Sequence, residues 1–185
     1  MGENMNVANK ISILGFQVFC GDKDGLADTK GVINTINPHS YVISRKDETF
    51  RKALEAADHL LPDGTGITIA ARILAGQKIS KIAGSDLHET LLKSLNEKKG
   101  SCYYLGSSET TLNLIRERLE KEYPGVRSAF FSPPFRDTFT EEENETMINA
   151  VNDFSPDVLF VGMTAPKQEL WVHENRGNLN VPLIC

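Results

Sequence analysis

The sequence predicts an α/β protein with a Rossmann-like, mostly parallel sheet and helices on both faces. Short β-branched runs alternate along the chain with segments whose apolar residues recur at helical spacing. Those helical segments are long enough to serve as right-handed crossovers between parallel strands. The 185 residues contain no internal repeat, low-complexity tract or linker, so a single domain is expected.

Six strands are expected, each a short apolar or β-branched run bounded by turn residues. They cover residues 32–36, 60–61, 101–105, 126–131, 157–163 and 181–185. The first run stops at Asn37-Pro38, a typical turn dipeptide. The run 158–162 reads Val-Leu-Phe-Val-Gly and is the clearest buried strand.

Helices are expected where apolar residues share one face. The segments with such a face are 50–57, 66–75, 86–98, 112–119, 140–151 and 166–171. Gly76 and Gly100 follow two of them, and Thr140-x-x-Glu143 forms a capping box at the start of another. Pro166 occupies a natural first-turn position for the last helix.

Three segments are expected to lie outside these elements. Residues 1–10 are polar, which favours a disordered N-terminus ahead of the domain of residues 11–185. Asp22-x-Asp24-Gly25 imitates a calcium loop, but Ile33 replaces its twelfth-position carboxylate, so a turn is favoured. The loop Ser132–Asp137 is long and irregular, and is a candidate mobile flap.

The composition argues against several functions. With 20 Lys and Arg against 25 Asp and Glu, the net charge of −5 argues against broad nucleic-acid binding. The three cysteines and four histidines show no metal-ligand or disulfide spacing, which suits a reducing cytoplasm. No secretory signal and no run of about 20 apolar residues is visible, so any membrane contact would be peripheral.

Several chemically useful residues fall at or just after the ends of the expected strands. These are Thr35, Asn37, Asp63, Gly106 and the segment Thr164–Gln168. Ligands of open parallel sheets gather at the carboxyl ends of the strands. One composite site at that edge is therefore expected.

The motif Asp63-Gly64-Thr65-Gly66 has two interpretations. Asp63 could be only the N-cap of the following helix, a position that aspartate favours. Alternatively, the glycines let a ligand approach the backbone, the helix start attracts an anion, and Asp63 acts as a general base. An acidic side chain beside an anion site favours a nucleotide-linked reaction over simple phosphate binding.

Three further motifs are less specific. In Gly84-Ser85-Asp86, a cap at Ser85 or Asp86, completed by Glu89, is favoured over ligand contact. Leu105-Gly106-Ser107-Ser108 is similar to a nucleotide-binding turn but lacks the Gly-x-Gly-x-x-Gly fingerprint. Pro166-Lys167-Gln168-Glu169 has two interpretations. It is either the start of a helix that begins with proline, or a site where Lys167 and Gln168 contact a diphosphate or a sugar hydroxyl. Trp171 is interpreted as a core or interface anchor.

In their order along the chain, these motifs resemble the WecG/TagA/CpsF family of bacterial glycosyltransferases. The likeness extends from Ile11 to the end and rests on Thr35-x-Asn37-Pro38, Asp63-Gly64-x-Gly66, Gly84-Ser85-Asp86-Leu87, Leu105-Gly106 and Pro166-Lys167-Gln168-Glu169. It implies an inverting transferase that moves an N-acetylhexosamine, typically N-acetylmannosamine, from a UDP-sugar to a polyprenyl-diphosphate-linked sugar. Such enzymes build teichoic acid, capsule or exopolysaccharide chains.

The same resemblance implies roles for individual residues. Asp63 matches the catalytic base and Thr35 a neighbouring active-site residue, without a metal or other cofactor. The positions expected to hold the substrates are Asn37, Gly64, Gly66, Lys81, Gly84, Ser85, Asp86, Gly106, Pro166, Lys167, Gln168 and Glu169.

This chain departs from the family pattern at three places. Gly162-Met163-Thr164-Ala165 replaces a glycine-rich stretch, and Pro133-Pro134-Phe135 replaces a frequent Gly-Tyr-Phe segment, so altered sugar specificity is expected. Family members continue with a basic C-terminal segment that reaches the inner face of the cell membrane, whereas this chain stops at an apolar Pro182-Leu183-Ile184-Cys185. A truncated, cytoplasmic form with reduced activity and possible homo-oligomers is expected.

Two other functions stay open at this point. A non-catalytic UDP-sugar-binding module would bind UDP without turnover. A nucleotide-sugar epimerase or NAD-dependent oxidoreductase would share the fold, but the chain lacks both the dinucleotide fingerprint and a Tyr-x-x-x-Lys motif. In the favoured mechanism Asp63 deprotonates the acceptor hydroxyl, while helix N-termini and a basic side chain stabilise the departing diphosphate.

Overall fold

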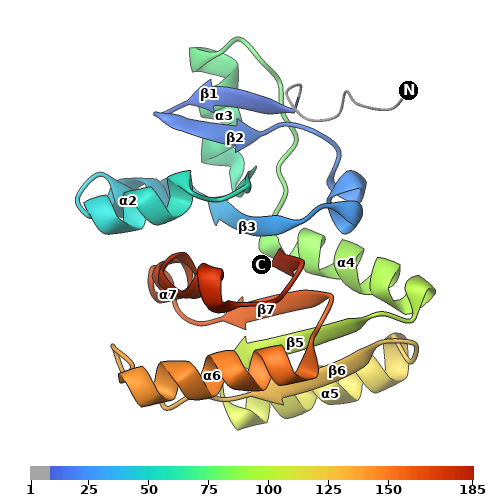
Figure 1. Cartoon of the computed structure of the whole chain (residues 1–185). Helices are drawn as coiled ribbons and strands as arrows, with labels where there is room; N and C mark the ends of the chain where they lie inside the picture. Colours follow the sequence, from blue (N-terminus) through green and yellow to red (C-terminus); the bar gives the residue numbers. More distant parts are fainter. Residues whose placement is uncertain (1–8) are drawn as a thin grey trace, which may run out of the picture.

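The computed structural model describes residues 9–185 and contains one six-stranded sheet (Figure 1). Its strands are β3 (Gly31–Ile36), β4 (His59–Pro62), β5 (Ser101–Gly106), β6 (Arg127–Phe131), β7 (Val158–Gly162) and β8 (Leu183–Ile184). They are ordered β4-β3-β8-β7-β5-β6, and each neighbouring pair is parallel. The predicted strands are confirmed, although the last one is shorter than expected. The expectation of disorder falls on residues 1–8 outside the described part of the chain, whereas Lys10 already belongs to a strand.

Helices cover both faces of this sheet, as the sequence predicts. The helices are α1 (Pro38–Ser44), α2 (Glu48–Glu55), α3 (Thr65–Leu74), α4 (Gly84–Lys98), α5 (Glu109–Glu122), α6 (Glu141–Phe154) and α7 (Lys167–Asn175), with short 3-10 turns η1 (Lys23–Asp28) and η2 (Arg176–Asn178). The leucines of α4 and α5 pack on Cys102, Tyr104 and Phe160 of one sheet face. Because alternate strand residues point to opposite faces, Tyr103, Leu105 and Leu159 pack under α6 and α7 instead.

A β-hairpin near the N-terminus was not expected from the sequence. Strand β1 (Lys10–Ile13) pairs antiparallel with β2 (Phe16–Phe19). Leu14 and Gly15 join them with φ angles of 55° and 81°, the positive pair that a two-residue hairpin turn requires. The inward side chains of the hairpin pack against α2, α3 and β4, where they extend the core beyond the end of the sheet.

Two helix starts also differ from expectation. Helix α1 was not expected, because Asn37-Pro38 was interpreted only as a strand stop. The Asn37 side chain accepts a hydrogen bond from the Ser40 amide, the Ser40 hydroxyl accepts one from the Asn37 amide, and Pro38 opens the helix. Pro166 lies at the N-cap of α7 rather than inside its first turn.

Candidate functional site

The residues predicted at strand ends lie along one edge of the sheet. All six strands are parallel, so their carboxyl ends share an edge. Asn37 follows β3, Asp63 follows β4, Gly106 ends β5, and Thr164 comes shortly after β7. Neighbouring strands lie about 4.8 Å apart, so the three spacings from β4 to β7 separate Asp63 from the β7 turn by roughly 14 Å. The site therefore has two halves.

Asp63 does not cap the helix that follows it. The N-cap of α3 is Gly64, with φ of 95° and no side-chain cap bond. The Asp63 amide donates to the carbonyl of Ile36 at 2.9 Å. Among residues 9–185 its half-buried carboxylate has no hydrogen-bond or ion-pair partner. The cap interpretation is therefore wrong, and the described residues give the carboxylate no structural partner.

Gly66 has a packing role that is independent of any ligand. A Cβ atom at this position would lie 2.6 Å from Cγ of Pro38. Helices α1 and α3 thus approach each other too closely for a side chain at Gly66. This contact holds the start of α3 against the end of β3.

The strand register brings Thr35 and Asn37 beside Asp63. Thr35 pairs with Leu61, and Ile36 pairs with Pro62, so the residues after the two strands are level with each other. Asn37 uses its side-chain oxygen to cap α1 at 2.9 Å. Its amide NH₂ group is the part of the side chain left to meet a ligand. Thr35 is half-buried at the end of β3.

The start of α4 lies against the same half of the site. The amide of Ile82 donates to the carbonyl of Pro62 at 2.9 Å, next to Asp63 in the chain. Exposed Lys81, Gly84 and Ser85 flank this contact. The N-cap is Ala83 rather than Ser85 or Asp86, but Asp86 does contribute to the cap, because its carboxylate accepts from the Ala83 amide at 2.9 Å. Glu89 pairs with Lys93 and completes no cap.

The other half of the site opens into a groove of about 1250 Å³. Its walls are the β5–α5 turn, the loop after β6 and the β7–α7 turn. Gly106 has φ of 117°, and a Cβ there would lie 2.5 Å from the Gly162 carbonyl, so only glycine fits between β5 and β7. Of the predicted residues, those lining the groove are Gly106, Pro166 and Lys167. Those outside its lining are Thr35, Asn37, Asp63, Gly64, Gly66, Lys81, Gly84, Ser85, Asp86, Gln168 and Glu169.

The loop after β6, residues 132–139, is held at several points. The Ser132 hydroxyl donates to the Ser107 carbonyl at 2.8 Å, and Arg136 pairs with Glu143 at 3.2 Å. The Lys167 ammonium donates to the Arg136 carbonyl and lies 3.7 Å from the centre of the Phe139 ring. Partial burial lowers the pKa of Lys167. Lys167 therefore fastens this loop to α7 at the edge of the groove.

Helix α7 places Gln168, Glu169 and Trp171 in different surroundings. Gln168 is half-buried, and its amide donates to Glu169 Oε1 at 3.1 Å. Glu169 was expected at the substrate, but it is 5% exposed and lies on the buried side of α7. Burial raises the pKa of its carboxyl group. Trp171 is 4% exposed and donates to Asn144 at 2.8 Å, which confirms its interpretation as an anchor.

Sequence reasoning missed the outer wall of the groove. Asn144, Trp171 and Glu174 line it from α6 and α7. Their spacing within helices carries no sign of a shared site, because only the packing of α6 beside α7 brings them together. Across residues 9–185, no group of three or more metal-ligating side chains occurs. In the same range, no helix is both long and apolar enough to cross a bilayer.

Comparisons with known proteins agree with the motif pattern. A profile described as the Glycosyl transferase WecG/TagA/CpsF family matches residues 12–185. A relative from Bacillus spizizenii, named N-acetylglucosaminyldiphosphoundecaprenol N-acetyl-beta-D-mannosaminyltransferase, is 28% identical over 82% of this chain and 57% of its own length. Proteins of the same name from Bacillus subtilis and Staphylococcus aureus are each 27% identical over 78% of this chain. The chain spans 55–57% of the length of these relatives.

Proposed function

This chain belongs to the WecG/TagA/CpsF family of glycosyltransferases, and we propose that it transfers N-acetylmannosamine from a UDP-sugar to a polyprenyl-diphosphate-linked N-acetylglucosamine. The names of the relatives supply the transferred sugar and the acceptor. The observation that carries the catalytic part is the Asp63 carboxylate. It lies at the ligand edge of the sheet, and the described residues leave it without a partner.

Asp63 acts as the general base in this proposal. It removes the proton from the acceptor hydroxyl, whose oxygen then bonds to the anomeric carbon. The bond from that carbon to the diphosphate oxygen breaks on the opposite face, and UDP leaves with the electron pair. Thr35 and Asn37 stand on the neighbouring strand end to orient the sugar. A positioned base of this kind contributes about 10²–10⁴-fold to the rate.

The UDP part of the donor lies in the groove beside the β5–α5 turn. Helix α5 begins there with Glu109 after a Ser108 cap, so the backbone N–H groups of its first turn, which lack intrahelical partners, lie at the groove edge. The donor then extends along the sheet edge, past β7, toward Asp63. An elongated nucleotide-sugar is the kind of ligand that can occupy both halves at once.

Replacement of Asp63 by Asn tests the base. We expect UDP release with a lipid-diphosphate acceptor to fall by at least about 10²-fold. UDP affinity, measured by calorimetry, is expected to stay within a few-fold, since the groove is intact. Asp58→Asn is an unsuitable control, because the Asp58 carboxylate holds the Val32 amide and Arg176. The control is Asp153→Asn, at an exposed position of α6. Unchanged turnover in Asp63→Asn would contradict the assignment.

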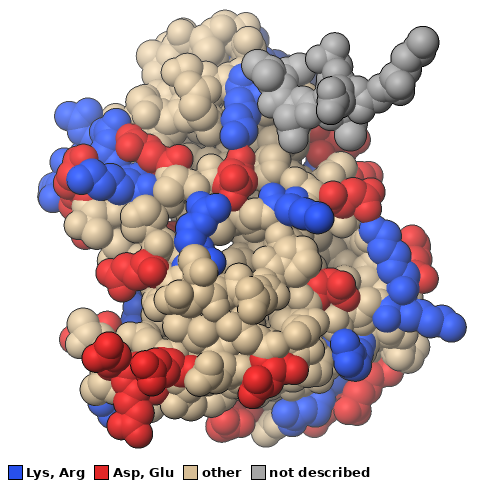
Figure 2. Space-filling view, viewed as in Figure 1, with Lys and Arg blue, Asp and Glu red and all other residues tan. Residues whose placement is uncertain are grey.

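The acceptor proposed here is anchored in a bilayer, and helix α3 offers a surface suited to one. Ile67 and Ala71 of this helix are buried, yet Ile69, Ile73 and Leu74 are 51%, 75% and 62% exposed. The exposed cations Arg72, Lys78 and Lys81 adjoin them, and residues 64–85 contain no Asp or Glu. In Figure 1, α3 lies largely behind the hairpin at the upper end of the molecule, and the part of that end visible in Figure 2 carries few charged side chains.

We propose that this α3 surface, formed by the six exposed residues just named, contacts an anionic phospholipid bilayer. Apolar side chains enter the interface while lysine and arginine approach the headgroups, each cation being worth about 1 kcal/mol. None of the three cations forms an ion pair with a described residue. Since α3 starts two residues after Asp63, the contact would place the base near the membrane surface.

A further inference from the structure

A small cavity lies behind the site, between β3, α2 and α7. Its volume is about 10 Å³, close to the smallest that holds one water molecule. The lining residues are Val32, Asn34, Ala53, Ala56, Glu169, Val172, His173 and Arg176. Two of these residues have a buried side-chain atom without a partner in the described part of the chain: Glu169 Oε2 and His173 Nδ1.

These two atoms need a hydrogen-bond partner. A buried polar group left unpaired costs about 1–3 kcal/mol, and the penalty here would apply twice. Glu169 and His173 are four residues apart on α7, so their side chains lie on the same face of the helix. Both side chains line the same cavity.

We infer that this cavity binds one ordered water molecule, which bridges Glu169 Oε2 and His173 Nδ1 and makes Glu169 a positioning residue for Gln168. Water suits the site because it can donate to one atom and accept from the other. Asn34 in the cavity wall offers the amide group that a third hydrogen bond needs. The raised pKa of the buried Glu169 carboxyl favours a protonated oxygen that donates to this water.

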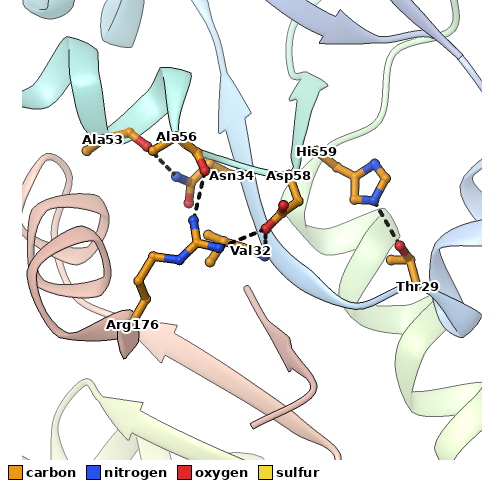
Figure 3. A network of polar contacts seen from close by, with 8 residues as sticks. All are labelled: Thr29, Val32, Asn34, Ala53, Ala56, Asp58, His59 and Arg176. Carbon is orange, nitrogen blue, oxygen red and sulfur yellow. Dashed lines mark hydrogen bonds and ion pairs between the residues drawn. The ribbon is translucent and has the colours of Figure 1, made fainter. Parts of the chain in front are cut away.

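The network around the cavity keeps its walls together. Arg176 donates to the Ala56 carbonyl at 2.9 Å and pairs with Asp58 at 3.3 Å (Figure 3). The same Asp58 oxygen accepts from the Val32 amide at 2.8 Å. Figure 3 shows these contacts joining the end of α2, the start of β3 and the end of α7. These contacts join the three elements that frame the cavity.

Two residues that line the cavity are chain neighbours of predicted site residues. Asn34 precedes Thr35 on β3, and Glu169 follows Gln168 on α7. One oxygen of Glu169 holds the Gln168 amide at 3.1 Å, which leaves the Gln168 side-chain oxygen to accept from a sugar hydroxyl. The water holds the other oxygen. The water therefore fixes the position of β3, which carries Thr35, relative to α7, which carries Gln168. Its effect on ligands rests on the proposed function.

Three variants test the inference: Glu169→Gln, Glu169→Leu and the control Glu120→Leu on the exposed side of α5. Gln keeps an acceptor for Gln168 and polar atoms for the water, whereas Leu removes both. We expect Glu169→Leu to bind UDP-N-acetylmannosamine about tenfold more weakly while its affinity for UDP is unchanged. Glu169→Gln and Glu120→Leu should match the wild type within about threefold. Equal weakening of UDP and UDP-sugar would show a general structural loss and overturn the positioning role.

High-resolution crystal structures of wild type and Glu169→Leu decide the water independently of any ligand. We expect density within hydrogen-bond distance of Glu169 and His173 in the wild type, lost in the Leu variant together with the Gln168 orientation. A dry wild-type cavity, in a crystal that shows ordered water elsewhere, would overturn the inference. An unchanged Gln168 in Glu169→Leu would overturn the positioning role. If wild type binds no UDP-sugar, the proposed function fails while the crystal structures still judge the water.

Discussion

The His88 imidazole is packed among aromatic rings on the α4 side of the sheet. Its ring centre lies 4.8 Å from that of Phe160 and 5.8 Å from that of Tyr104. The Tyr104 hydroxyl and His88 Nε2 are hydrogen-bonded at 2.7 Å. Burial, and secondarily the charge of Arg118, lower the pKa of His88 below its ordinary 6.5. The folded protein therefore holds this histidine neutral.

This burial predicts an acid-sensitive stability. The unfolded chain binds a proton at His88 near pH 6.5, while the folded protein resists it until lower pH. The contribution is complete above pH 6.5 and is lost as the pH falls toward the lowered pKa. We expect wild type to lose more stability than His88→Gln between pH 7.5 and pH 5, measured by urea unfolding. His39→Gln, at an exposed position of α1, is the control; equal pH slopes in His88→Gln and wild type would contradict the prediction.

Single residues also show where local patterns mislead. Asp63 follows a strand and precedes a helix, so local sequence permits a cap, yet Gly64 takes that position. Asp86 lies inside the helix and reaches back to the Ala83 amide. In both cases the cap depends on where the backbone turns into the helix. That turn is set by contacts such as Pro38 against Gly66 and Ile82 against Pro62, which join distant parts of the chain.

At the scale of elements, α3 is apolar on two sides but covered on only one. A helix that is apolar all round is normally buried. The hairpin β1–β2 and α2 cover the side of Ile67 and Ala71. The other side carries Ile69, Ile73 and Leu74. The membrane contact proposed for this surface follows from that unequal cover and from its unpaired cations.

The α3 surface predicts binding to anionic vesicles. We expect this chain to co-sediment with vesicles of phosphatidylglycerol and phosphatidylcholine more than with phosphatidylcholine alone. The double variant Ile73→Gln and Leu74→Gln should weaken that binding by at least about 30-fold, since each apolar side chain contributes about 1–2 kcal/mol when partly buried.

Leu114→Gln is the matched control, because Leu114 is equally exposed (62%) but lies on α5. Vesicle binding that is insensitive to the double variant would contradict the proposal. So would a dimer that dissociates in the double variant, because a second copy of the chain would then be the partner of α3.

The hairpin illustrates which elements sequence patterns can reveal. Ile11 and Ile13, then Phe16 and Val18, alternate with polar residues on either side of Leu14-Gly15. That alternation is a hairpin signal, but a ten-residue apolar segment also suggests other structures. Strands β5 and β7 of the main sheet are more easily predicted, because burial on both faces makes them largely apolar. Helix α1 has only seven residues and is defined by its cap rather than by an apolar face.

At the scale of the whole molecule, the proposed diphosphate contacts come from distant segments. The backbone at the start of α5 supplies positive charge beside the groove, and the backbone at the start of α4 supplies it beside Asp63. We predict that turnover needs no divalent metal, since these groups would stabilise the departing diphosphate. UDP release should be the same, within about twofold, in EDTA and in Mg²⁺. A loss of activity in EDTA that Mg²⁺ or Mn²⁺ restores would contradict it.

The succession of the strands β3 to β8 along the chain, and the edge at which the predicted site residues lie, were determined by the sequence alone. Apolar periodicity and parallel crossovers are local or topological rules, so β3 to β8 and the positions of Asn37, Asp63 and Gly106 follow from them. The tertiary structure decided which residues share a space. It divided the site into an Asp63 half and a groove half, bound Lys167 to the loop after β6, and buried Glu169. Those outcomes depend on side-chain packing between segments more than 30 residues apart, to which no local pattern is sensitive.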